Sequence, residues 1–411
     1  MRLLIVTDAF PPNCGGSGWS TFHLARALLS RGHSVEVVQA RAGEPGIRTR
    51  TFESIPVQEY GFRSSHVPGW RALQRRRALD DGLTGFLADR AGHADLVHAQ
   101  HLLSIPPAVT AARRASVPVV VTVRDYWPVC LYGTLWRDQT VCPVCRGTEQ
   151  VRCLAQKYGP LARLSYPLLP FVQAELRRRQ QALRDSSAVI AVSRFVARTL
   201  KGIVLPAQVK VVPNLIDVDG AQQMARTSQA SHVEPYLVFV GKLNAAKGAD
   251  LLPEIRRRAG VDLPLKVVGG GDITPRLAGA PGIQLCGSVS NREALAILAG
   301  ARALVFPARW PEPLSRVLIE AQALGVPTAA SDTGGTPDII EHDHNGLLSD
   351  ALDRMAENVA RLVGDAALRG RISENAVDVA RARFDETVVT GQLEQVYAEA
   401  IGAPVPAGAL T

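Results

Sequence analysis

The chain has 411 residues, too many for one ordinary hydrophobic core, and this length predicts two domains of roughly 150–200 residues each. Hydrophobic residues make up 46% and charged residues 20%, a composition typical of folded globular proteins and not of disordered chains. The formal net charge is +8, but aromatic residues make up only 5% and no stacking platform or recognition-helix pattern is present. These features argue against a nucleic-acid-binding protein.

The apolar start of the chain, MRLLIVTDAF, predicts a β-strand and not a signal sequence, because the run is short and Asp8 interrupts it. No later stretch approaches the roughly 18 apolar residues of a membrane span. We therefore expect a cytoplasmic protein, with peripheral contact at the inner face of the membrane as an option. Arginine runs at residues 75–77, 177–179 and 256–258 predict either solvated helix faces or a basic surface for anionic lipids or phosphate-bearing substrates.

Alternating strands and helices run along the chain in two series. The first opens with a strand at Leu3–Asp8 and a helix near Ser20–Ser30. Its further strands are expected at Val35–Ala40, Asp95–His98, Val117–Val123, Ala188–Val192 and Val209–Val212. Strands of the second series are expected at Tyr236–Val240, Leu265–Val268, Ile283–Cys286, Ala303–Phe306 and Thr328–Ser331. Near-continuous Val and Ile indicates parallel strands buried on both faces, so each series predicts a doubly wound Rossmann-like α/β domain.

Two glutamates eight residues apart follow the strand expected at Ala303–Phe306. Pro313 suits the first turn of a helix, so we expect Glu312 at the helix N-terminus. Eight helical steps would carry the chain about 12 Å and leave Glu320 on roughly the same side. Such a pair of acceptors could hold two ends of an extended polar ligand, while free amides at the helix start bind phosphate. A solvated helix face is the alternative interpretation.

The segment EPLSRVLIEAQALGVPTAASDTGGTPDIIEHDHNGLL resembles the donor-site signature of the retaining family 4 glycosyltransferases, which adopt the GT-B fold. Supporting motifs are VTDAFPPNCGGSGW, LVHAQHLL, AVIAVSRFVARTL, VVPNLIDVD, FVGKLNAAKGADLL and VVGGGD, and the resemblance extends from about residue 1 to 390. It implies that Glu312 contacts the hydroxyls of the donor sugar and that Glu320 contacts the ribose. Leu314 and Ser315, between them, are also expected at the donor.

The resemblance also implies a domain plan, in which two Rossmann-like domains face each other across a cleft. We expect an N-terminal acceptor-binding domain at 1–213, with a cysteine-containing insertion at about 126–160. A C-terminal nucleotide-sugar donor domain is expected at 214–380. A helix at 381–401 would cross back to the N-terminal domain, and a flexible tail would follow at 402–411.

Glycines and lysines mark the expected phosphate site. Gly15 and Gly16 lie between the first strand and the first helix, where a backbone without side chains can approach a phosphate. A plain turn is the alternative there, and the full dinucleotide-binding pattern G-x-G-x-x-G is absent. Lys242 and Lys247 follow the strand Tyr236–Val240, and the family has a basic pair at these positions. Two fixed cations would stabilise a departing nucleoside diphosphate without a metal ion, although they could also be surface lysines.

The pocket for the nucleotide base is assigned from the resemblance alone. Gly270, Gly271, Asp272 and Ser288 follow strands of the second series, and in the family such positions line the base. Gly241, directly after the strand Tyr236–Val240, is expected at the donor without an assignment to the base. A purely turn-forming role for these residues is the alternative.

The N-terminal domain departs from the family pattern at Arg124. Many relatives carry a histidine at the end of this strand, whereas this chain reads Arg124-Asp125. Arginine cannot act as a base because it stays protonated, but it can donate hydrogen bonds to a phosphate or a carboxylate. Asp125 is expected either to orient the acceptor or to form a structural salt bridge. His98 and His101 lie near the end of another strand. Two interpretations are open for them: contact with the acceptor substrate, or a core position with satisfied hydrogen bonds.

Four cysteines gather in the expected insertion: Cys130, Cys142, Cys145 and Cys153. Cys142 and Cys145 have the two-residue gap of a zinc knuckle, which favours a structural zinc. A redox-labile pair and inert thiols are the alternatives.

Together these observations predict a retaining glycosyltransferase that moves a hexose-type sugar from a UDP- or GDP-linked donor to a glycan, lipid-linked or small-molecule acceptor. No cofactor is expected for catalysis. Two alternatives stay open: a nucleotide-sugar-binding protein whose catalysis is impaired, and a nucleotide-sugar 2-epimerase.

Overall fold

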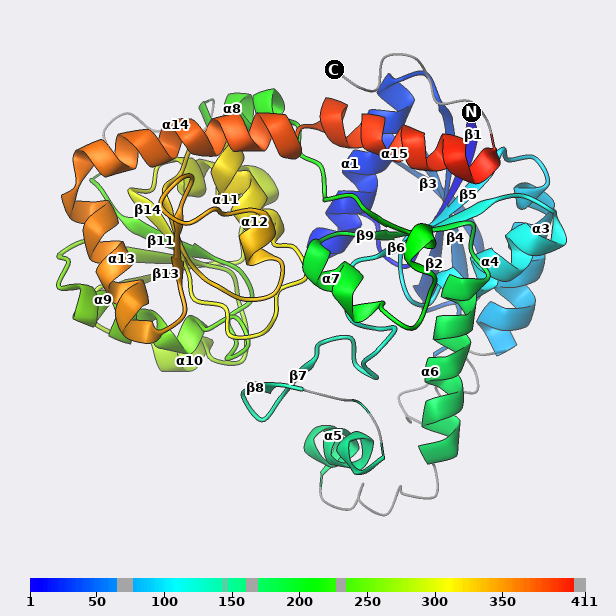
Figure 1. Ribbon diagram of the computed structural model, residues 1–411, viewed down its shortest axis with the longest axis horizontal. Helices are drawn as coiled ribbons and strands as arrows, with labels where there is room; N and C mark the ends of the chain where they lie inside the picture. Colours follow the sequence, from blue (N-terminus) through cyan, green and yellow to red (C-terminus); the bar gives the residue numbers. More distant parts are fainter. Residues whose placement is uncertain (65–76, 143–144, 146, 160–168, 227–233, 403–411) are drawn as a thin grey trace. The chain divides into compact units, whose positions relative to one another are not determined.

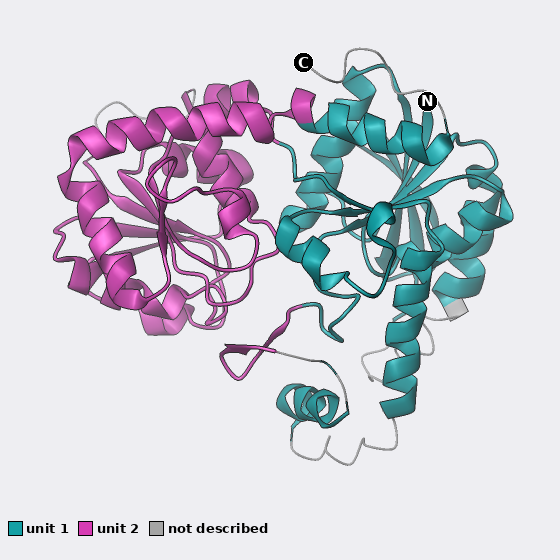
Figure 2. Cartoon of the chain, viewed as in Figure 1, with its two compact units in different colours: residues 1–133, 144–215, 389–411 teal, residues 134–143, 216–388 magenta. Residues whose placement is uncertain are grey.

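A computed structural model describes residues 1–64, 77–142, 145, 147–159, 169–226 and 234–402 (Figure 1). The chain forms two compact units, each with its own sheet (Figure 2). Unit 1 comprises Met1–Gly133, Val144–Leu215 and Val389–Thr411, and unit 2 comprises Thr134–Pro143 and Ile216–Val388. None of the helices that the structure describes is long and apolar enough to cross a membrane.

The sheet of unit 1 has eight strands in the order β10-β9-β6-β5-β1-β2-β4-β3. Along the chain the strands are β1 (Arg2–Thr7), β2 (Ser34–Ala42), β3 (Gly46–Phe52), β4 (Ile55–Phe62), β5 (Leu96–Ala99), β6 (Val119–Val123), β9 (Ala188–Ala191) and β10 (Val209–Val211). All pairs are parallel except β3 with β4, which form an antiparallel hairpin at one edge. This hairpin was missed because five of the seven β3 residues are exposed and none is buried, so no buried apolar run marks the strand.

The helices of unit 1 are α1 (Gly16–Ser30), α3 (Thr84–Ala91), α4 (Ile105–Arg114), α5 (Thr148–Tyr158), α6 (Leu169–Arg184), α7 (Arg194–Thr199) and most of α15 (Glu386–Ile401). Helix α15 packs into the core of unit 1 through Val389, Leu393, Val396 and Tyr397. This helix thus completes the first core, although it follows the second unit in sequence.

Unit 2 is built around a six-stranded sheet in the order β13-β12-β11-β14-β15-β16, parallel throughout. Its strands are β11 (Leu237–Val240), β12 (Leu265–Val268), β13 (Ile283–Gly287), β14 (Ala303–Phe306), β15 (Thr328–Ser331) and β16 (Leu347–Ser349). Its helices are α8 (Val218–Arg226), α9 (Leu252–Ala259), α10 (Thr274–Leu277), α11 (Asn291–Ala299), α12 (Arg316–Ala323), α13 (Leu352–Gly364) and α14 (Ala366–Arg383).

Two parallel Rossmann-like sheets confirm the predicted fold class. The central strands are apolar and buried, as in β6, whose five residues are all buried, and helices cover the sheets. A short hairpin, β7 (Trp136–Arg137) with β8 (Thr140–Val141), lies within the expected insertion but is grouped with unit 2. The expected helix at 381–401 is two helices, because α14 ends at Arg383 and α15 begins at Glu386. The expected tail lies outside the described residues from residue 403 onward.

Candidate active site

Several of the expected donor residues follow strands at the carboxyl edge of the unit 2 sheet. Lys242 and Lys247 follow β11, Glu312 follows β14, and Ser288 follows β13. Because carboxyl ends of parallel strands meet at one edge, this edge is where a doubly wound domain binds ligands. Unit 2 therefore has the framework of a nucleotide site within itself.

Glu312 and Lys247 contact each other directly. The carboxylate of Glu312 is buried, with the residue 7% exposed, and its Oε2 accepts hydrogen bonds from the Lys247 ammonium and from the indole Nε1 of Trp310, the latter at 2.8 Å. A buried carboxylate needs such donors, because an unpaired buried charge is costly. Trp310 was not predicted as a site residue. Its position two residues before Glu312 was the only signal in the sequence, and that signal is weak.

The expected helix start at Glu312 is wrong. Helix α12 begins at Arg316, and Ser315 is its N-cap, with a side-chain oxygen that accepts from the Leu318 amide at 3.4 Å. Serine is a preferred N-cap, so the cap three residues later sets the boundary. Glu312 lies instead in the loop before the helix, where its carbonyl accepts a hydrogen bond from the Gly335 amide at 2.7 Å. The 12 Å helical separation of Glu312 and Glu320 therefore does not apply.

Glu320 lies on α12 and is 6% exposed. Its Oε1 forms an ion pair with the Arg316 Nε at 2.9 Å, one helical turn earlier. Burial raises the pKa of Glu320, while the charge and hydrogen bond of Arg316 and a hydrogen bond from Asn291 lower it. A buried carboxylate held by an arginine is poised to accept hydrogen bonds from a polar ligand, because each neighbour that stabilises its charge also orients it. Leu314, like Ser315, is buried at the start of this segment.

Glycines bring the loops at this edge close together. A Cβ on Gly271 would lie 2.1 Å from the Leu243 carbonyl oxygen, so only glycine fits where these two loops touch. Gly270 lies beside Ser288, since its Cβ would be 3.3 Å from the Ser288 Oγ. Gly270, Asp272 and Ser288 are exposed. The structure thus places the residues expected at the base next to one another, and their role stays a prediction.

Helix α1 begins earlier than expected, at Gly16, with Gly15 as its N-cap. The glycines therefore form the first turn of the helix itself and not a preceding loop. A Cβ on Gly18 would lie 2.5 Å from the Cys14 Sγ, which explains one of the glycines by packing. Gly15 has open space around its Cα, which is compatible with the predicted approach of a phosphate.

Arg124 lies in a buried polar network of unit 1. Its guanidinium donates to Oε1 of Gln100, with Nη2 at 2.6 Å, and to Oδ1 of Asn214. Because Gln100 accepts through its oxygen, it presents its amide nitrogen to Nε2 of His98 at 2.8 Å. The Nδ1 of His98 therefore carries the hydrogen and donates to the Tyr397 hydroxyl at 2.6 Å. The network joins β5, β6, the segment after β10 and α15.

A small cavity of about 20 Å³ lies beside this network, lined among others by His98, Thr122, Arg124 and Asn214. Burial, with the nearby charge of Arg124, lowers the pKa of His98 to about 3, so this histidine is neutral at physiological pH. Of the two interpretations offered for His98, the core position is the one its burial and three polar neighbours support.

Replacing Arg124 by alanine should lower the free energy of unfolding by about 3 kcal/mol, because Gln100 and Asn214 would lose a charged donor inside unit 1. Chemical denaturation of both proteins measures this. Arg113→Ala is the matched control: Arg113 pairs with Asp185 at 2.7 Å but is 59% exposed, and should cost less than about 1 kcal/mol. An Arg124→Ala variant that unfolds like the wild type would contradict this structural role.

His101 lies just after β5, and its Nδ1 is 2.7 Å from the Thr7 hydroxyl, which donates to the Ala9 carbonyl at 2.9 Å. The Thr7 oxygen therefore accepts from His101. Burial, with the charge of Arg124, lowers the pKa of His101 to about 3. Its buried Nε2 has no hydrogen-bond partner among the described residues. The Nε2 of a neutral His101 could accept a hydrogen bond from the acceptor substrate, and that contact stays a prediction.

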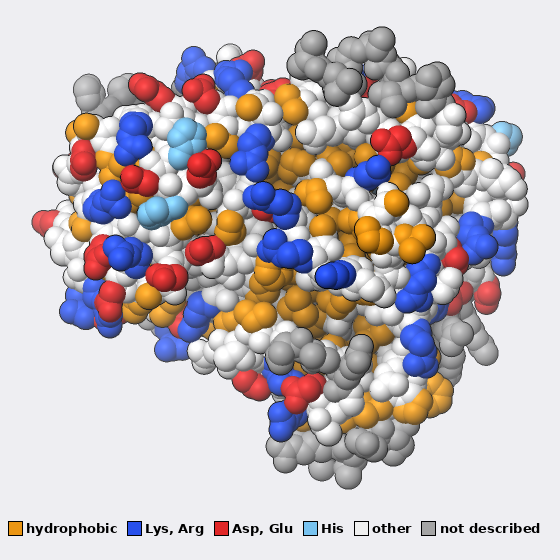
Figure 3. Space-filling model, in the orientation of Figure 1, with side chains coloured by type: hydrophobic (Ala, Val, Ile, Leu, Met, Phe, Trp, Pro, Cys, Tyr) orange, Lys and Arg blue, Asp and Glu red, His pale blue; other side chains and the backbone are white. Residues whose placement is uncertain are grey.

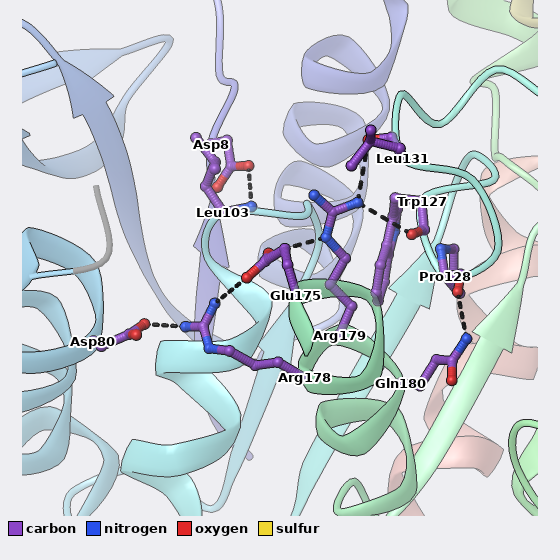
Figure 4. Close-up of polar contacts among 10 residues, drawn as sticks. All are labelled: Asp8, Asp80, Leu103, Trp127, Pro128, Leu131, Glu175, Arg178, Arg179 and Gln180. Atoms are coloured by element: carbon purple, nitrogen blue, oxygen red, sulfur yellow. Dashed lines mark hydrogen bonds and ion pairs between the residues drawn. The ribbon is translucent and has the colours of Figure 1, made fainter. Parts of the chain in front are cut away.

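Asp125 begins a loop that helix α6 holds in place. The Oδ1 of Asp125 accepts from the Trp127 amide at 2.8 Å. From α6, Arg179 donates to the carbonyls of Trp127 and Leu131, and Gln180 donates to the carbonyl of Pro128 at 3.0 Å (Figure 4). The loop geometry after β6 therefore depends on a helix about fifty residues later in the chain.

Burial raises the pKa of Asp125 to about 6, against the lowering effects of the Trp127 amide and the Arg179 charge. The folded state thus binds a proton more tightly than the unfolded chain, and stability should fall as the pH rises from about 4 to about 6. At pH 8, Asp125→Asn should raise the free energy of unfolding by about 2 kcal/mol and remove most of this pH dependence. Denaturation at pH 5 and pH 8 tests both points. The exposed Asp138→Asn should show neither effect, and a destabilised Asp125→Asn at pH 8 would contradict the argument.

The four cysteines lie on separate segments. Cys130 is buried in the turn after β6, Cys142 follows β8, and Cys153 lies on α5. Burial raises the pKa of the Cys145 thiol, as do its neighbours Cys130 and Cys153. Across the described residues, no group of three or more His, Cys, Asp or Glu could hold a metal ion. The structural zinc is therefore not supported. Two residues between Cys142 and Cys145 lie outside the described part of the chain.

The arginine runs are largely engaged within the protein. Arg178 pairs with Asp80, and the buried Arg179 pairs with Glu175 at 3.0 Å. Arg257 and Arg258 both pair with Glu254 at 2.6 Å. On the face of unit 2 drawn in Figure 3, basic and acidic side chains are intermixed. These runs thus provide less free positive charge than the sequence indicated. Residues 75 and 76 of the first run lie outside the described residues.

Comparison with known proteins identifies the family. The model described as Glycosyltransferase Family 4 matches residues 14–219, half of the chain, and the model described as Glycosyl transferases group 1 matches residues 234–365. The chain belongs to glycosyltransferase family 4, and it is a glycosyltransferase with the GT-B fold.

Several characterised proteins resemble it along most of its length. The GDP-mannose-dependent alpha-(1-6)-phosphatidylinositol monomannoside mannosyltransferase of Mycobacterium tuberculosis (strain CDC 1551 / Oshkosh) is 26% identical over 393 residues, 89% of each chain. The glycogen synthase of the same strain is 25% identical over 428 residues, 97% of this chain and 94% of the relative.

Solved structures show the same fold. Anabaena Alr3699/HepE in complex with UDP-glucose has a TM-score of 0.67 at 17% identity, covering 98% of this chain and 99% of that one. Sucrose-phosphate synthase from Thermosynechococcus elongatus has a TM-score of 0.70 at 18% identity, covering 98% and 100%.

Proposed function

We propose that this glycosyltransferase moves a hexose from a UDP- or GDP-linked donor to a glycan, lipid-linked or small-molecule acceptor, with retention of the anomeric configuration. Two of the proteins compared above support this range. The Mycobacterium tuberculosis mannosyltransferase is named as GDP-mannose-dependent and as a phosphatidylinositol monomannoside mannosyltransferase, and Alr3699/HepE was solved in complex with UDP-glucose. In this proposal unit 2 binds the donor.

The observation that carries the proposal is the contact of Lys247 with the buried carboxylate of Glu312 at the carboxyl edge of a parallel sheet. The site offers a cation for a diphosphate and, beside it, a carboxylate for sugar hydroxyls. On α12 the second buried carboxylate, Glu320, would accept from the ribose. Gly270, Asp272 and Ser288 would line the base, and Gly15 and Gly16 would approach the phosphates.

In the proposed step, the bond from the anomeric carbon to the phosphate oxygen breaks while the acceptor oxygen bonds to the same face of that carbon. The proton of the acceptor hydroxyl passes to the departing phosphate oxygen, so no protein base is needed. Lys242, which is exposed, and Lys247 would stabilise the charge that develops on the diphosphate. Since two lysines would supply this charge, we propose that no divalent metal is required.

A thermal-shift screen against UDP, GDP, ADP and their common sugar conjugates tests the donor site. A ligand that binds the native state raises the melting temperature by mass action. We expect one nucleoside diphosphate to stabilise the wild type. If none does so at millimolar concentration, the donor-site proposal fails.

One observation favours an alternative without turnover. Arg124, which stands where many relatives carry a histidine, is bound within the protein by Gln100 and Asn214. A nucleotide-sugar-binding protein would bind the donor but neither transfer nor hydrolyse the sugar. Release of nucleoside diphosphate from the bound donor, even slowly, would exclude this alternative.

Contact with an anionic membrane stays a separate prediction. Co-sedimentation with vesicles that contain increasing fractions of anionic lipid tests it directly. Binding should rise with the anionic fraction and fall with salt, since it would be electrostatic. Sedimentation that does not depend on anionic lipid would remove this prediction.

A further inference from the structure

Trp310 lies at the point where the two key loops of unit 2 meet. Its indole Nε1 donates to Glu312 Oε2 at 2.8 Å, the same oxygen that the Lys247 ammonium contacts. The Lys247 Nζ also lies over the Trp310 ring, 5.1 Å from its centroid. One side chain thus contacts both the carboxylate expected at the sugar and the cation expected at the diphosphate.

The backbone of Trp310 is anchored separately from its ring. The amides of Arg309 and Trp310 both donate to the Ala246 carbonyl, at 2.9 and 3.1 Å. The Arg309 side chain donates to the Ala245 carbonyl at 2.9 Å and pairs with Asp250 at 2.7 Å. These bonds tie the loop after β14 to the loop after β11 without using the indole, so a change of the side chain at residue 310 should leave both loops in place.

A bound diphosphate would compete to different extents for the two hydrogen-bond donors to Glu312. Lys247 carries a positive charge, and a bound diphosphate would compete with Glu312 for it. The indole N–H of Trp310 is neutral, so a diphosphate competes for it far less. Among the described residues, both side-chain hydrogen bonds to the Glu312 carboxylate go to Oε2 and none goes to Oε1.

We propose that Trp310 is a positioning residue of the donor site. When Lys247 turns to the diphosphate, the indole keeps Glu312 oriented through Oε2 and leaves Oε1 for the sugar hydroxyl. Trp310 would therefore determine how strongly the site recognises the sugar, as distinct from the nucleotide. This inference rests on the function proposed above.

The test compares the binding of UDP with UDP-glucose and of GDP with GDP-mannose by calorimetry. Trp310→Phe keeps a ring beneath Lys247 but removes the N–H. We expect it to weaken binding of the sugar nucleotide about 10-fold, the loss of one hydrogen bond to a charged group, and to change binding of the nucleoside diphosphate less than about twofold. Trp310→His, which restores a ring N–H, should recover part of the loss.

Trp19→Phe is the matched control. Trp19 lies in unit 1, where its ring packs edge-on against the Phe22 ring with 5.8 Å between the ring centroids. The same substitution there should leave the affinities for the nucleoside diphosphate and for the sugar nucleotide unchanged. Melting temperatures of all variants show whether they are folded. If Trp310→Phe does not fold, Trp310→His provides a second test of the proposal.

The outcomes separate the two proposals. If the wild type binds none of the four ligands, the proposed function fails and this inference with it. If the wild type binds, and Trp310→Phe weakens the binding of nucleoside diphosphate and sugar nucleotide equally or weakens neither, the donor site stands and the role of Trp310 is overturned.

Discussion

Replacing Lys247 by alanine should lower the rate of sugar transfer by about 10²–10³-fold, the largest effect we expect from a single substitution. The ammonium is part-buried, with its side chain 23% exposed, and lies against Glu312 and the Trp310 ring. Once Lys247 has turned to the bound diphosphate, its charge is in place before further negative charge develops on the leaving group. Its removal should therefore affect the transition state more than the ground state.

Release of nucleoside diphosphate from the donor that the thermal screen selects measures this effect. Lys210→Ala is a suitable control, because Lys210 also pairs with a glutamate, Glu399, at 2.6 Å, but does so in unit 1. It should transfer sugar at the wild-type rate. A rate for Lys247→Ala within threefold of wild type would remove Lys247 from the proposed machinery.

The second large effect is expected from Glu320→Gln, which should weaken binding of the nucleoside diphosphate at least 10-fold. The buried carboxylate would lose its charge, and Arg316 would lose its partner. Because burial raises the pKa of Glu320 in spite of Arg316, the neutral glutamine should not lower the free energy of unfolding, so a loss of binding can be told apart from a loss of folding. Glu394→Gln is the matched control: Glu394 is 7% exposed and pairs with Arg31 at 2.6 Å in unit 1. It should cost stability while leaving nucleotide binding intact.

The pH dependence of Glu320 has a definite sign. Because burial raises its pKa, protonation favours the folded state, and its contribution to stability should increase as the pH falls through that pKa. Nucleotide binding should change in the opposite direction if the carboxylate is the form that accepts from the ribose. The nucleotide titrates too, so the informative quantity is the pH slope of the wild type minus that of Glu320→Gln. A zero difference would contradict the assigned role.

The Glu312–Glu320 segment shows which features of the site a local sequence pattern can predict and which it cannot. Sequence reasoning selected both glutamates and the strand before them, since a buried apolar run followed by polar residues indicates a strand end. It placed the helix start incorrectly, because Pro313 and Ser315 are both good starting residues and only the observed cap hydrogen bond distinguishes them. The local propensities were nearly balanced, and the tertiary contact of Glu312 with Gly335 favoured the later start.

Arg124 and His98 show a different limit. Sequence reasoning placed each at a strand end, where an active site is expected, but side-chain direction and partners depend on the whole fold. Tyr397, which closes the network, follows His98 by 299 residues. The resemblance implied that a helix at 381–401 returns to the N-terminal domain, but no pattern within one segment could indicate that its Tyr397 would contact His98.

Some features of this protein were therefore decided by the sequence and others by the tertiary structure. The sequence by itself determined the two parallel sheets and the carboxyl-edge location of the expected donor residues, because buried apolar runs and strand ends are local properties. The tertiary structure alone decided that Trp310 joins Lys247 to Glu312 and that Arg124 is held by Gln100 and Asn214. Such contacts join side chains from loops and strands far apart in the chain, and their geometry exists only once the sheet and its covering helices have formed.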